Sequence, residues 1–216
     1  MALRPAKPLA RHRGHRVETA AAAVPVYLAV VLELLREPPE DEYSFIEDTI
    51  RQAVAVFESI TGIACINQTW KLTLDEWTHG SGDLPLPLAP IQNYITLPRY
   101  PLSSISAITT YSPSNTATPI TTSDFFFLDT NSLPGRLILK DGQNWPVALR
   151  SRNSIEISYV AGLGTSPDDV PVEIRRAIGQ IISYLYENRG AGCSAEKAVM
   201  ASGALQIAAE YVKVRL

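Results

Sequence analysis

The sequence predicts an α+β protein in which a small helical core carries an antiparallel β-rich insertion. Apolar residues recur with helical spacing before residue 65 and after residue 165, whereas they alternate with polar residues between these regions. The strand-like segments are separated by turn-rich pieces, without the crossover helices that a parallel sheet requires. The expected divisions are a flexible basic arm at 1–17, a helical core at 18–65 and 165–190, a β-rich insertion at 66–164 and a C-terminal docking tail at 191–216.

Two helices are predicted ahead of the β-rich region. The first covers about residues 25–37, with one apolar stripe, and ends before Pro38 because proline cannot continue a helix. Ser44 and Glu47 have the spacing of a capping box, which predicts the start of the second helix. Gly62 is expected at its end, in the left-handed conformation.

The β-rich region begins where Trp70, Leu72 and Leu74 alternate with polar residues, the pattern of a half-buried strand. Further short strands are predicted at 94–97, 104–111, 125–128, 137–139 and 155–159. Together they favour an antiparallel sheet or a small sandwich. A third helix is predicted at about 171–188, capped by Asp168 or Asp169, and the tail that follows contains weaker helical signals.

Charge is unevenly distributed along the chain. The formal net charge is −3, yet residues 1–16 contain five basic and no acidic residues, so the remainder carries −8. A basic arm on an acidic body suits contact with an acidic partner or nucleic acid, and a solvated tail is the alternative. The five basic residues are Arg4, Lys7, Arg11, Arg13 and Arg16.

Residues that could support catalysis or metal binding are sparse and scattered. His12 and His15 lack a nearby acidic or cysteine partner, and Cys65 and Cys193 form no CxxC pair. The glycines around Leu163 lack the Gly-Lys-Ser/Thr of a phosphate loop and are better explained as a tight connection into the third helix. The sequence therefore predicts no enzyme activity, no metal site and no cofactor.

The run of three phenylalanines at 125–127 could form a base-stacking platform, but packing within the sheet is the favoured interpretation. The most apolar stretch, 24–35, is too short to span a bilayer. No secretory signal is recognised at the N-terminus, so a protein made in the cytoplasm is expected, with no membrane partner.

Read in order, several short segments resemble the head–tail connector (adaptor) proteins of long-tailed phages and gene transfer agents. The resemblance covers about residues 44–190 and depends on the order and spacing of the segments. These are Ile60-Thr61-Gly62, Ile66-Asn67-Gln68-Thr69-Trp70, Ile95-Thr96-Leu97-Pro98-Arg99-Tyr100-Pro101-Leu102, Pro134-Gly135-Arg136-Leu137, Trp145-Pro146, Ile155-Glu156-Ile157-Ser158-Tyr159-Val160-Ala161-Gly162, Val170-Pro171 and Tyr186-Glu187-Asn188-Arg189.

The resemblance implies a structural subunit of the virion neck, at the head–tail interface. Such a subunit forms a ring, usually of twelve copies, on the portal protein, extends the DNA channel and provides a platform for the next neck (stopper) or tail protein. DNA would pass through the channel without sequence-specific binding. No active site or cofactor is implied.

The expected docking segments are the basic arm described above and the tail with Tyr211, Lys213 and Arg215, although the tail could instead pack on the chain's own helices. Two other functions stay open. One is a tail-completion protein, and the other is a small hydrolase or carbohydrate-binding β module, which would require a polar cleft with convergent histidines or carboxylates.

Overall fold

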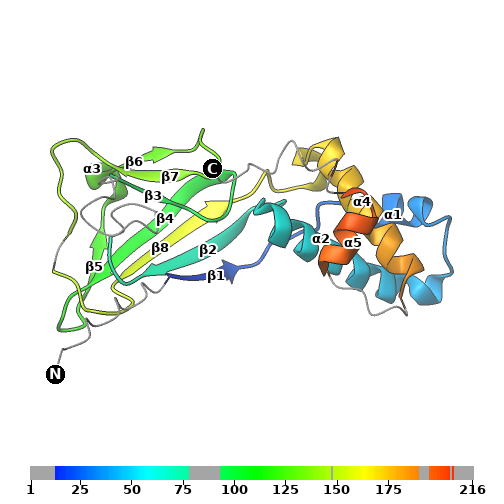
Figure 1. The fold of residues 1–216 in the computed structure, drawn as a ribbon, viewed down its shortest axis with the longest axis horizontal. Coiled ribbons are helices and arrows are strands. Elements are labelled where there is room, and N and C mark those ends of the chain that lie inside the picture. Colours follow the sequence, from blue (N-terminus) through cyan, green and yellow to red (C-terminus); the bar gives the residue numbers. More distant parts are fainter. Residues whose placement is uncertain (1–12, 78–92, 147, 190–194, 205, 207–216) are drawn as a thin grey trace, which may run out of the picture.

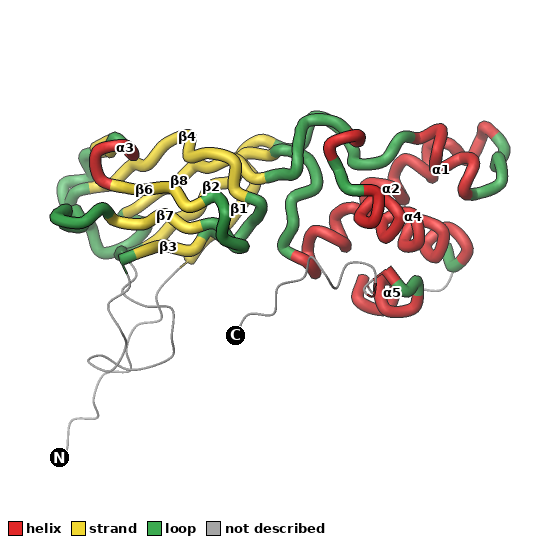
Figure 2. The backbone as a smooth tube through the Cα atoms, turned by 90° about the horizontal axis from the view of Figure 1, so that it is seen from above, coloured by secondary structure: helices red, strands yellow, loops and turns green. Residues whose placement is uncertain are grey.

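The computed structural model describes residues 13–77, 93–146, 148–189, 195–204 and 206. The molecule is elongated, with a helical lobe at one end and a sheet lobe at the other (Figures 1 and 2). Every pair of named strands is antiparallel. The predicted α+β class with an antiparallel β-rich region is therefore confirmed.

The helical lobe contains α1 (Leu28–Leu34), α2 (Tyr43–Thr61), α4 (Val172–Glu187) and α5 (Ala195–Ala201). The long helices α2 and α4 pack against each other through buried stripes that include Ile50, Phe57, Ile174, Ile178 and Ile181. These stripes repeat every three or four residues, which places them on one face of each helix. The three helices predicted from the sequence are thus present, and no described helix combines the length and hydropathy needed to cross a membrane.

The predicted helix caps are only partly correct. The Ser44 capping box does not form, because a 3₁₀ turn, η1 (Glu40–Glu42), runs directly into α2 and its carbonyls take the first N–H groups. Asp169 caps the 3₁₀ turn η2 (Pro167–Asp169), where it forms a capping box with Ser166, and α4 itself follows Pro171. Gly62 adopts the predicted left-handed conformation after α2, with φ of 81°.

The sheet lobe is a sandwich of two sheets. Their strand orders are β1-β2-β8-β4-β5 and β3-β7-β6, and side chains of both sheets share one core. Both β2 and β8 bury alternate residues, as a strand with one covered face must. The strands are β1 (Arg13–Thr19), β2 (Gln68–Leu74), β3 (Tyr94–Thr96), β4 (Leu102–Tyr111), β5 (Ala117–Ile120), β6 (Phe126–Asp129), β7 (Arg136–Leu139) and β8 (Ile155–Ala161), and the short helix α3 (Thr122–Phe125) precedes β6.

The prediction of a flexible arm at 1–17 is wrong for residues 13–17. They form most of β1, which pairs with β2 along its length, and residues 18 and 19 belong to the same strand rather than to the helical core. His15 fixes this strand, because its ring stacks on Trp70 at 4.6 Å between centroids and is hydrogen-bonded to Tyr159 Oη at 2.8 Å. Residues 1–12 lie outside the described residues.

Two other features of the sheet lobe bear on the sequence predictions. Strand β5 was not predicted, since Pro119 and its exposed neighbours look like a loop, but an edge strand tolerates proline. In the phenylalanine run, Phe126 is buried beside Trp77 and Trp145, whereas Phe127 is 59% exposed. The three rings therefore do not form one stacking platform.

The start of the predicted docking tail packs on the helical lobe. Helix α5 contacts α2 and α4, and Val199 and Ala204 lie in the helical core. This matches the intramolecular alternative for residues 195–204. Residues 207–216 lie outside the described residues.

The two lobes meet where backbone segments approach each other closely, and one such contact is made by Gly162. Its N–H donates to the carbonyl of Pro101 at 3.0 Å, and Asn67 donates to the carbonyl of Gly164 at 2.8 Å. A Cβ atom at Gly162 would lie 2.5 Å from the backbone N and Cα of Asn67, closer than real contacts allow. The glycines after β8 therefore make a tight connection into α4, as predicted.

We expect Gly162→Ala to lower the free energy of unfolding by about 3 kcal/mol, the upper end of overpacking costs, because backbone must move to admit the methyl group. Gly142→Ala is the matched control, since Gly142 has φ of 80° and nothing within 4 Å of the added atom. That variant should lose about 1 kcal/mol. Chemical denaturation measures both, and equal losses would contradict a close approach at Gly162.

Candidate functional site

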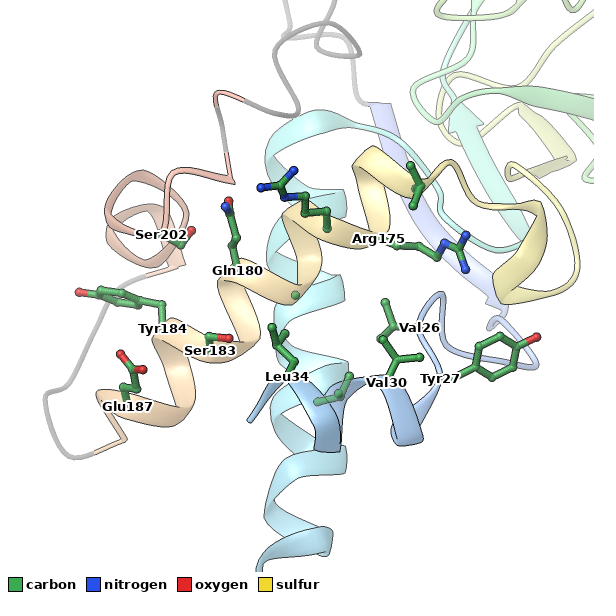
Figure 3. Close-up of a pocket in the computed structure, with 14 residues that line it drawn as sticks. Val26, Tyr27, Val30, Leu34, Arg175, Gln180, Ser183, Tyr184, Glu187 and Ser202 are labelled. Atoms are coloured by element: carbon green, nitrogen blue, oxygen red, sulfur yellow. The ribbon is translucent and has the colours of Figure 1, made fainter. Parts of the chain in front are cut away.

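An apolar groove of 710 Å³ lies between α1 and α4 in the helical lobe (Figure 3). Val30 and Leu34 line its α1 side, and Val172 lines the start of its α4 side. The rest of the α4 side is mostly polar, with Arg175, Arg176, Gln180, Ser183, Tyr184 and Glu187. Gly179 brings the α4 backbone close to α1, since a Cβ atom there would lie 3.1 Å from Leu34 Cδ2. Ser202, just after α5, lines the same groove.

Helix α1 has apolar side chains on two faces, although it lies at the surface. Val31 is 2% exposed in the helical core, whereas Val30 and Leu34 are 58% and 50% exposed on the groove side. Val172, across the groove, is 62% exposed. A helix that is apolar on nearly all sides normally has partners on all sides, so this groove has the character of a docking surface.

One polar cluster lies at the end of the groove where Tyr27 stands. Tyr27 Oη donates a hydrogen bond to Asp168 at 2.8 Å, and this bond raises the pKa of Tyr27. Arg175 lies 3.8 Å from the same carboxylate. The described lining residues include no histidine or cysteine beside the two serines of the groove, Ser183 and Ser202.

The two lobes differ in charge. The described residues of the helical lobe and its connections, 20–66, 162–189, 195–204 and 206, include 13 acidic and 6 basic residues, a formal charge of −7. Those of the sheet lobe include 7 acidic and 8 basic residues, a formal charge of +1. The acidic character predicted for the whole body therefore belongs to the helical lobe.

The predicted docking residues are only partly within the described chain. Arg13 and Arg16 lie on β1, where they pair in register with Leu74 and Lys71. The register places Arg13 at the end of the sheet away from the helices. The others lie outside the described residues, and their docking roles stay predictions: Arg4, Lys7, Arg11, Tyr211, Lys213 and Arg215.

Arg16 belongs to a polar, ion-paired region of the five-stranded sheet. Lys71, opposite Arg16, forms salt bridges with Glu18 at 2.7 Å and Glu156 at 3.6 Å. The hydrogen bond from Lys71 lowers the pKa of Glu18, and the same contact raises the pKa of Lys71. Mixed charges in pairs make this region unlike a basic nucleic-acid-binding patch.

The histidines and cysteines do not gather into a site within the described residues. His15 is part of the aromatic stack, and Cys65 is a buried free thiol whose pKa is raised by burial. No group of three or more potential metal ligands occurs in the described part of the chain. His12, His79 and Cys193 lie outside it.

A buried carboxylate joins the lobes. Glu58, near the end of α2, is 9% exposed and accepts hydrogen bonds from the Cys65 N–H at 2.7 Å and from Gln68 Nε2 at 3.1 and 3.0 Å. The guanidinium of Arg99 donates to its main-chain carbonyl. Burial raises the pKa of Glu58, against the opposing effect of these donors. Sequence reasoning missed this residue, because a glutamate in an amphipathic helix looks like a surface residue.

No protein-family model and no curated protein sequence matches this chain. Solved structures do share its fold. A chain from the virion of a native gene transfer agent (GTA) particle is 22% identical with a TM-score of 0.74, covering 94% of this chain and 96% of that one. A chain from the neck of an empty GTA particle, computed with C6 symmetry, is 22% identical with a TM-score of 0.75, over 94% and 97%.

A chain from the neck of a native GTA particle, computed with C12 symmetry, is 23% identical with a TM-score of 0.67, over 93% of this chain and 97% of that one. At these identities the likeness shows a shared fold. It spans both lobes and nearly the full length of each chain, so the arrangement of helical and sheet lobes is common to all of them.

Glu58 gives a prediction for stability against pH. Its folded-state pKa lies above the ordinary value of 4.5, so its stabilising contribution is complete below that value and is lost as pH rises through the folded-state pKa. We expect the Tm of Glu58→Gln, measured relative to that of the wild type, to rise as pH increases from about 4 to about 8.

The control for this prediction is Glu47→Gln, which removes the same charge from an exposed position of α2. Its Tm should run parallel to that of the wild type over the same pH range. A Glu58→Gln profile parallel to the wild type would show that Glu58 is not protonated more readily in the folded state.

Proposed function

We propose that this chain is a structural subunit of the neck of a phage-like particle, with no catalytic activity and no cofactor. Twelve copies form a ring at the head–tail interface, dock on the portal protein and extend the DNA channel. The ring offers its far side to the next neck or tail protein. The observation that carries this proposal is the fold shared over both lobes with chains of GTA virions and necks.

The ordered sequence segments support the same proposal independently of the fold comparison, because their resemblance depends on the order of amino acids and on no coordinates. In the structure several of them build the connections between the lobes. The segment with Arg99 and Tyr100 contacts the end of α2, where Tyr100 Oη donates to the carbonyl of Thr61 and the Tyr100 N–H donates to that of Gly62.

The last segment also fixes the helical lobe. Arg189 forms a salt bridge with Glu42 at 3.0 Å, and Tyr186 donates to the same carboxylate. These bonds join the end of α4 to the start of α2. The resemblance therefore concerns residues that set the relative placement of elements, as a shared architecture would require.

The two ends of the molecule suit a subunit placed between two partners. An acidic lobe stands at one end and a nearly neutral sheet lobe at the other. A cyclic ring also needs two different complementary surfaces on each subunit. The groove of the helical lobe and the ion-paired sheet are two surfaces of different character, which suits contacts with different partners.

Electron microscopy of the purified chain mixed with the portal protein of the same particle tests this proposal. We expect a ring coaxial with the portal, with twelve copies of the chain. A chain that stays monomeric and ignores the portal would overturn the adaptor assignment. Binding to the tail tube instead of the portal would favour the alternative, a tail-completion protein.

The basic arm is tested by changing Arg4, Lys7 and Arg11 together to alanine. We expect the affinity for the portal to fall about tenfold or more, since each lost rim charge slows association and weakens the contact. A matched triple variant, Arg36→Ala, Arg51→Ala and Lys140→Ala, removes the same charge from exposed positions elsewhere and should keep its affinity. Equal losses would show that only net charge matters.

A further inference from the structure

The groove between α1 and α4 has an apolar surface that nothing in the described chain covers. Its two walls leave Val30, Leu34 and Val172 at least half exposed, as described above. Apolar side chains gathered in one concave surface favour an occupant that is itself apolar on one side.

The chain itself supplies a suitable peptide next to the groove. Ser202 lines the groove, and residues 207–216 follow within a few positions. Ten extended residues reach about 33 Å, more than the roughly 24 Å of the α4 wall. A segment tethered this close has an effective concentration on the order of millimolar, which favours it over a second copy.

The composition of the segment matches the groove. Val212, Val214 and Leu216 alternate with Lys213 and Arg215, so an extended strand would present one apolar and one basic side. The helical lobe carries a formal charge of −7, and the segment, with one acidic residue, carries +1. The apolar side fits Val30, Leu34 and Val172. The basic side can pair with Glu187, the acidic residue among the described lining residues, although Arg175 and Arg176 also line the groove.

We propose that residues 207–216 dock in the α1/α4 groove of their own chain in the free subunit. The segment covers the exposed aliphatic side chains of Val30, Leu34 and Val172. Its docking on a further protein would then require release from this groove. The proposal concerns the isolated chain and stands or falls separately from the assembly on the portal.

Hydrogen exchange followed by mass spectrometry on the full chain tests the proposal. We expect amides of 207–216 to exchange at least about tenfold more slowly than in an unstructured peptide, at every protein concentration. Val30→Asp in the groove and Val212→Asp in the segment should each abolish this slowing. Val17→Asp is the matched control, because Val17 is an exposed valine, 41% accessible, on β1 of the sheet lobe, and it should leave the slowing intact.

Three results would overturn the proposal. Exchange of 207–216 at unstructured rates in the wild type would mean that the groove awaits another occupant. Slowing that grows with concentration, together with dimers in light scattering, would mean that the segment docks on a second copy. Retained slowing in Val30→Asp, with circular dichroism showing an intact fold, would place the segment elsewhere.

Discussion

The buried carboxylate of Glu58 links the helical lobe to the sheet lobe. The Glu58 side chain extends from α2, and its carboxylate accepts hydrogen bonds from the Cys65 N–H and from Gln68 Nε2, where the chain enters β2. A carboxylate with so little exposure is tolerated only when donors surround it, so the end of α2 and the start of β2 have one favourable arrangement. Arg99 binds the carbonyl of the same residue and adds the loop before β4 to this arrangement.

Each lobe has a hydrophobic core of its own, and the junction is where their positions are set. The helical core contains residues such as Ile46 and Ile178, whereas the sheet core contains Leu72 and Ile157. The helical lobe has a negative formal charge and contains the apolar groove, and the sheet lobe has oppositely charged side chains in ion pairs. Such a division suits a protein that meets different neighbours at its two ends.

Much of the fold follows from local pattern. The apolar stripes of α2 and α4 and the alternation in β2 are each visible within a few turns or residues, and the structure contains these elements close to where they were predicted. Strand β1 was missed because its polar sequence, with Val17 as its aliphatic residue, shows no alternation. What makes it a strand is His15 stacking on Trp70, a contact between residues that lie far apart in the chain. The Ser44 cap failed for a similar reason, since the preceding turn had already satisfied the helix start.

Local sequence patterns were enough to predict the fold class, the long helices, most strands, and the ordered segments that resemble head–tail connectors. Which apolar residues stay uncovered and which charges are buried became visible with the packing of the folded chain. Val31 and Val30 are neighbours of the same type, yet one lies in the core and the other in the groove. Glu58 and Glu47 lie on one helix, yet one is buried at the junction and the other pairs with Arg51 at the surface. Periodicity reports the faces of an element, whereas burial depends on what packs against each face, and that is settled by contacts between distant parts of the chain.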